Sequence, residues 1–290
     1  MGDDFIFWDS LIEVLTDTLK TLPFLYVTYL IMEYIEDKAE EKTILALRKA
    51  RGAGPLVGSL LGLLPQCGFS TAAASLFSGG VITEGALIAV FLATSDEMLP
   101  VMISESVSMS VIGHILLIKF LCGCIFGYLI DFSRRLFFRR RLKMHIHDLC
   151  EQEHCHCEEG NIFLSALRHT VNIIVFIFII SLACELLVDS LGVDAVAGFF
   201  SGNDVLGVFM AALIGLIPNC AASVLITQLY LEQIITVGQL MAGLLVGAGV
   251  GLMVLYRTNR GMRSNLIITL LLYGAGVISG LIIQAAGIVL

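Results

Sequence analysis

The chain has 290 residues, of which 57% are hydrophobic and only 14% are charged, with a formal net charge of −8 and a mean hydropathy of +0.91. Soluble domains carry about 25% charged residues, so this composition excludes an ordinary soluble protein and indicates an integral membrane protein. The charges lie in a few short loops, so the net charge is no evidence of an acidic partner. No nucleic-acid-binding motif is present, and the expected partner is the lipid bilayer.

The first predicted element is a membrane span from Leu11 to Tyr34. The preceding segment "MGDDFIFWDS" lacks the basic region of a signal peptide, so we expect the span to be retained. The following loop is basic, which is typical of cytoplasmic loops and predicts an external N-terminus. Its basic residues are Lys38, Lys42, Arg48, Lys49 and Arg51.

A polar motif, "GLLPQCGFS" from Gly62 to Ser70, interrupts the next apolar region. Pro65 removes a backbone donor and disfavours helical geometry in the residue before it. The apolar stretches on either side are each too short to cross a bilayer, so they form either one interrupted span or a re-entrant hairpin. Non-helical backbone at membrane depth occurs where protein or water covers it, which predicts a cavity at the break. A simple proline kink with small packing residues is the alternative.

The segment from Val81 to Met102 is either a second hairpin, turning near "TSDEMLP", or a true span. It contains Asp96 and Glu97, and carboxylates within a span are costly and usually functional. They could bind a divalent cation or carry a proton; at the outer surface they would be solvated loop residues. The next span, Val107 to Ile130, contains His114 and Lys119. Either could pair with an acid in the cavity, or Lys119 could extend to the interface.

The central loop, residues 132–160, begins with the basic "RRLFFRRRLK" and is expected in the cytoplasm. Dense His and Cys suit zinc, copper or another thiophilic ion, so the loop is a candidate metal-capturing or sensing segment; the alternative is a flexible polar linker. The candidate ligands are His145, His147, Cys150, His154, Cys155, His156 and Cys157.

The second half repeats the first at an offset of 153 residues. "GLIPNCAAS", Gly215 to Ser223, aligns with the first motif, and the register continues through "VITEGAL" and "IITVGQL". Loop charges reverse between the copies, which predicts inverted topology of the kind common in secondary transporters. The predicted fold is all-α, with two inverted repeats of about five segments each and broken or re-entrant helices at mid-membrane. The expected divisions are residues 1–131, 132–160 and 161–290.

Two-fold symmetry should bring the two breaks together around one substrate site. Half-helix ends offer amides to an anion and carbonyls to a cation. A thiophilic cargo would favour Cys67 and Cys220, whereas manganese prefers oxygen ligands such as those of Asp96 and Glu97. The candidate substrate-binding residues are Gln66, Cys67, Ser70, Asn219, Cys220, Ser223, Asp96 and Glu97, and the candidate metal ligands among them are Asp96, Glu97, Cys67 and Cys220.

These motifs, together with the His-rich loop, resemble the putative heavy-metal exporter family with ten predicted transmembrane segments, labelled arsenic efflux protein or putative manganese transporter. The resemblance covers essentially the whole chain and is most specific in the two Pro-amide-Cys motifs and in Ser95-Asp96-Glu97. It implies export of a metal or metalloid ion by a carrier in a prokaryotic plasma membrane.

We therefore predict a secondary active transporter and no enzyme, with a divalent, manganese-like ion preferred over arsenite. The alternatives are an oxyanion or organic-anion carrier, an ion channel and, last, a membrane-embedded enzyme. No nucleotide-binding loop is present, so we expect an ion gradient to drive transport, with protons carried by Asp96 or Glu97. No tightly bound cofactor is expected, and the oligomeric state is left open.

Overall fold

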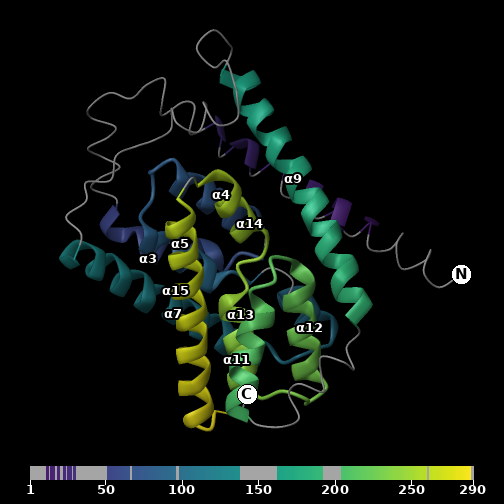
Figure 1. Ribbon diagram of the computed structural model, residues 1–290. Coiled ribbons are helices and arrows are strands. Elements are labelled where there is room, and N and C mark those ends of the chain that lie inside the picture. The colour runs from purple at the N-terminus through teal and green to yellow at the C-terminus, as the bar shows by residue number, and fades with distance from the viewer. Residues whose placement is uncertain are drawn as a thin grey trace, which may run out of the picture.

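The computed structural model describes residues 51–65, 67–95, 98–137, 162–191, 204–259 and 261–288, and most positions between 11 and 30. Within these ranges every regular element is a helix, which confirms the predicted all-α class (Figure 1). The first half contains η1 (Arg51–Ala53), α3 (Gly54–Gly62), α4 (Cys67–Ser78), α5 (Glu84–Ala93), α6 (Met98–Ser104) and α7 (Met109–Phe137). The second half contains α9 (Ile162–Leu191), α11 (Asp204–Gly215), α12 (Cys220–Leu231), α13 (Val237–Val246), α14 (Val250–Thr258) and α15 (Met262–Ala285).

Four stretches of the described chain are long and apolar enough to cross a membrane. They are Glu84–Ser104, which runs through residues 96 and 97, Met109–Leu136, Val237–Thr258 and Met262–Ala285. The predicted span at 107–130 corresponds to α7, and α15 is its equivalent in the second half. The chain is therefore built as a multi-pass membrane protein.

Both proline motifs separate two helices. The helix α3 ends at Gly62 before α4 begins at Cys67, and α11 ends at Gly215 before α12 begins at Cys220. A second pair of interruptions follows: α5 ends at Ala93 before α6 begins at Met98, and α13 ends at Val246 before α14 begins at Val250. With 10 residues each, α5 and α13 extend about 15 Å, roughly half of a hydrocarbon core.

The helices α5 and α13 form the buried centre of each half. The helix α5 packs against α3 and α7, and α13 packs against α11 and α15. Small residues allow this close approach: a Cβ atom on Gly58 would lie 2.8 Å from the carbonyl oxygen of Ala86. On α15, a Cβ atom on Gly280 would lie 2.7 Å from the carbonyl oxygen of Gly238. Backbones thus meet directly, as small residues permit in membrane helices.

Equivalent positions of the two halves make equivalent contacts. The hydroxyl of Thr83 donates to Asp131 Oδ2 at 2.8 Å, where α5 begins beside the end of α7. Adding 153 to each number gives Thr236 and Gln284, whose side chains form a hydrogen bond of 2.5 Å between α13 and α15. Each pair therefore ties the start of a buried helix to its long neighbour.

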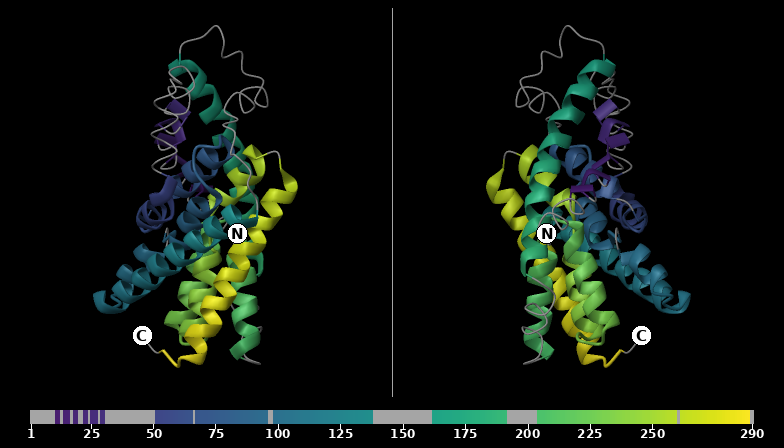
Figure 2. Two further views of the ribbon diagram at one scale, coloured as in Figure 1. Left: turned by 90° about the vertical axis from the view of Figure 1, so that its left-hand side faces the viewer. Right: turned by 90° about the vertical axis from the view of Figure 1, so that its right-hand side faces the viewer.

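The two halves also pack against each other. The helix α14 of the second half lies against α4 of the first, and the two are labelled side by side in the upper middle of Figure 1. Ser78 Oγ and Thr258 Oγ1 are 2.7 Å apart at this contact. The long helices α7 and α15 cross at an angle (Figure 2), where the Cys122 thiol donates to Ser279 Oγ at 3.5 Å. The halves therefore form one packed unit.

We predict that Gly127→Ala destabilises the protein and that Gly113→Ala, on the same helix, does not. A Cβ atom on Gly127 would lie 2.7 Å from the carbonyl oxygen of Gly85 and 2.8 Å from Pro55 Cβ, whereas nothing lies within 4 Å of one on Gly113. Overpacking of this kind costs about 1–3 kcal/mol. Thermal unfolding in detergent should show a lower midpoint for Gly127→Ala alone; equal midpoints would contradict the close packing of α5 and α7.

Candidate functional site

A small cavity lies where the interrupted helices of both halves meet. It has room for about one water molecule. The ends of α5 and α13, the start of α6, the middle of α7 and the break between α11 and α12 all contribute to its wall. The lining residues are Thr94, Ser95, Met98, Lys119, Gly215, Asn219, Cys220, Ala222, Ser223, Gly243, Leu244, Gly247 and Gly249.

The break in the second half supplies three of the residues predicted for the site. Asn219 caps α12, and its side-chain oxygen accepts a hydrogen bond of 2.7 Å from the backbone N–H of Cys220. Ser223 donates to the Cys220 carbonyl oxygen at 2.8 Å. Asn219 and Cys220 are buried, Ser223 is half-buried, and all three line the cavity. The Pro-Asn-Cys motif therefore begins a helix at the cavity wall.

The corresponding break in the first half is described only in part. Gln66 and the side chain of Cys67 lie outside the described residues, so the predicted meeting of the two Pro-amide-Cys motifs stays a prediction. Ser70 is fully buried, but it is not among the residues that line the cavity. It packs against α14 instead, where a Cβ atom on Gly251 would lie 2.7 Å from Ser70 Cβ.

The end of α5 contributes two hydroxyl groups to the cavity. Thr94 Oγ1 donates to the carbonyl oxygen of Val90 at 2.8 Å, and Ser95 Oγ donates to that of Ala93 at 3.0 Å. The proton of each hydroxyl is thus donated to a nearby backbone carbonyl oxygen. The lone pairs of each hydroxyl oxygen remain able to coordinate a cation. Asp96 and Glu97 follow directly in sequence and lie outside the described residues.

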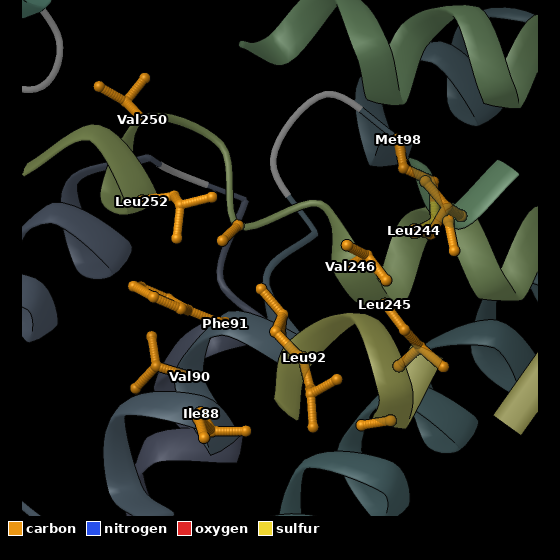
Figure 3. Packing of buried hydrophobic residues seen from close by; sticks show 14 of the residues in the cluster. Ile88, Val90, Phe91, Leu92, Met98, Leu244, Leu245, Val246, Val250 and Leu252 are labelled. Carbon is orange, nitrogen blue, oxygen red and sulfur yellow. The ribbon is translucent and has the colours of Figure 1, made fainter. Parts of the chain in front are cut away.

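The segment between α13 and α14 contains two glycines and lines the same cavity. The helix α13 ends at Val246, and Gly247 and Gly249 line the wall before α14 begins. Gly249 has φ 53° and ψ −143°, a conformation that is essentially restricted to glycine. Figure 3 shows the turn of the chain between Val246 and Val250, with Met98 of α6 beside Leu244. Motif analysis missed this link because it contains no polar side chain.

Lys119 and His114, both on α7, have opposite environments. Lys119 is 1% exposed, lines the cavity and donates from Nζ to the carbonyl oxygen of Leu244 at 3.0 Å. Extension to the membrane interface, one alternative for this lysine, is therefore excluded. His114 is exposed and its Nδ1 lies 2.6 Å from the Ser110 carbonyl oxygen of its own helix, so pairing in the cavity is wrong for His114.

The predicted metal-binding segment of the central loop, from His145 to Cys157, lies outside the described residues and stays a prediction. Within the described part of the chain, no three His, Cys, Asp or Glu side chains cluster closely enough to hold a metal ion. The polar side chains that the described residues contribute to the cavity wall are three hydroxyl groups, one amide, one thiol and one ammonium group, and Met98 adds a thioether.

These features define a multi-pass helical membrane protein with a small polar cavity at the meeting point of interrupted helices. The chain belongs to the family described as "Putative, 10TM heavy-metal exporter", whose profile matches residues 7–197, and this confirms the predicted family over that range. The match includes the first break, the central loop and α9, and it ends before the second break. No curated protein and no solved structure matches the chain.

Proposed function

We propose that this protein is a secondary active carrier that exports a divalent metal ion, manganese rather than arsenite, across the plasma membrane. The family supports metal export. The observation that carries the cargo assignment is the cavity between the helix breaks, because its described wall offers three hydroxyl oxygens and an amide against one thiol and the thioether of Met98. Manganese prefers oxygen ligands, whereas arsenite and soft cations prefer thiolates.

Three hydroxyl groups favour a cation over an anion at this wall. Thr94, Ser95 and Ser223 all donate their protons to backbone carbonyl oxygens, so their lone pairs are the groups left to contact a cargo. We infer that Asp96 and Glu97, which stand in sequence between the lining residues Ser95 and Met98, supply the charge that a divalent ion requires.

The size of the cavity supports a single small ion. Room for about one water molecule admits a dehydrated metal ion and does not admit an organic anion in this conformation. The ion would exchange its hydration shell for the oxygens of the wall. A site that coordinates one dehydrated ion favours a carrier over a channel.

The two halves are proposed to be inverted-topology repeats that alternate access to this cavity. Their helices recur at the same offset of 153 residues as the sequence motifs; for example, α4 spans 67–78 and α12 spans 220–231. The basic loops at 36–52 and 132–160 then lie in the cytoplasm, with the N-terminus outside. An ion gradient, with H⁺ as the proposed coupling ion, would drive export.

An oxyanion is the second candidate cargo, because one observation favours it. Lys119 places a buried ammonium group in the cavity wall, and α12 begins at the wall with its N-terminus. Both features attract anions. The N–H of Cys220 already donates to Asn219, however, which leaves less of this helix end for an anion.

We predict that the purified protein in proteoliposomes transports Mn²⁺ more readily than arsenite and that Thr94→Val weakens Mn²⁺ transport. Loss of one oxygen ligand should raise the half-saturating Mn²⁺ concentration about tenfold. Asp96→Asn should abolish transport. Cys220→Ser should stay within about threefold of wild type, as should Cys124→Ser, a matched substitution outside the cavity. Arsenite transport that only Cys220→Ser abolishes would establish a thiophilic cargo.

We also predict that Mn²⁺ protects Cys220 from a small thiol reagent. In a variant that keeps Cys220 as its only cysteine, bound Mn²⁺ should fill the cavity and slow the reaction with methyl methanethiosulfonate several-fold. A variant with only Cys124, which does not line the cavity, is the control. Equal protection of both thiols, or of neither, would place the Mn²⁺ site elsewhere.

A further inference from the structure

The buried lysine of the cavity has a role that metal binding alone does not explain. Lys119 carries the single charged side chain among the described residues that line the cavity. A charged group within a membrane span is costly, and a positive charge in the wall repels a divalent cation. We therefore expect the ammonium group of Lys119 to have a function in the transport of a cation.

One partner of Lys119 is a carbonyl oxygen at a helix end. In a continuing α-helix the Leu244 carbonyl oxygen would accept from the N–H of Ala248, but that N–H donates to Val246 at 2.7 Å. Lys119 Nζ donates to Leu244 at 3.0 Å instead. Carbonyl groups at a helix C-terminus carry partial negative charge and attract cations. The ammonium group therefore lies where the wall is best suited to hold a positive ion.

The second half shows that the packing of the fold does not require this charge. The position equivalent to Lys119 is Leu272, and the position equivalent to Leu244 is Phe91. Leu272 and Phe91 are fully buried, as Lys119 nearly is. An apolar side chain thus fills the equivalent position in the other repeat. The packing that the two repeats share therefore does not require an ammonium group at Lys119.

We propose that Lys119 is a tethered cation that occupies the cavity when no cargo is bound and that a metal ion displaces. This inference rests on the proposed function. A carrier must return without cargo, and an empty cavity would leave the partial negative charge of the α13 carbonyl end without a counter-charge in a low-dielectric medium. The ammonium group supplies that counter-charge, and its long flexible stem lets it move aside when the metal ion enters.

The test compares two transport modes in proteoliposomes containing wild type, Lys119→Met, Lys119→Gln or Leu272→Met. Net efflux of Mn²⁺ into metal-free medium requires the empty carrier to return, whereas exchange of Mn²⁺ for Mn²⁺ does not. Both neutral variants should lose net efflux at least about tenfold and keep exchange within about threefold. Their half-saturating Mn²⁺ concentration should fall about tenfold, because the competing charge is gone. Leu272→Met, at the equivalent site, should behave as wild type.

Each other outcome overturns the proposal. Lys119→Gln keeps a donor for Leu244, so normal net efflux in this variant would show that Lys119 supplies only a hydrogen bond. A higher half-saturating concentration in the neutral variants would show that Lys119 attracts the cargo. If neither neutral variant folds while Leu272→Met does, the lysine is a structural requirement. If wild type moves no Mn²⁺, the proposed function fails first, and this inference fails with it.

Discussion

The structure depends on one constraint: backbone groups freed by a helix interruption within a membrane must be covered by protein or by water. Three of the interruptions, those after α5, after α13 and before α12, meet this constraint by lying around one cavity. The C-terminal ends of α5 and α13 and the N-terminal end of α12 line one cavity, and the neighbouring helices pack against them. Asn219, Thr94 and Lys119 each satisfy a backbone group at a helix end there. The same groups that make the breaks tolerable thus make the cavity polar.

Close helix packing is what holds these helix ends in position. The short helices α5 and α13 could not remain fixed by their own hydrogen bonds, because each has only 10 residues. Glycines at positions such as 127 and 280 let the long helices α7 and α15 contact them backbone to backbone. The ties from Thr83 to Asp131 and from Thr236 to Gln284 then fix the distant end of each buried helix. The long helices α7 and α15 therefore hold the short helices α5 and α13 in position.

Much of this organisation could be predicted from the sequence. The offset of 153 residues and the two prolines located the breaks before α4 and α12, since Pro at these positions acts on the backbone locally. The turns after α4 and after α12 show what the sequence does not reveal. Both turns have a residue with positive φ, Gly80 in one and Gln233 in the other, and only glycine is a residue type from which such a conformation can be predicted. The contact of Ser70 with Gly251 and the burial of Lys119 depend on packing between the halves, which helical periodicity does not specify.

The central claim is that one metal ion binds where the interrupted helices of the two halves meet. The most direct measurement is an experimental density map of the membrane-embedded protein with bound Mn²⁺, with the ion identified by its anomalous scattering. The account predicts a single Mn²⁺ peak in the cavity beside Thr94 and Asn219. A peak only at the central loop, 132–160, with the cavity sealed by continuous helices, would contradict it.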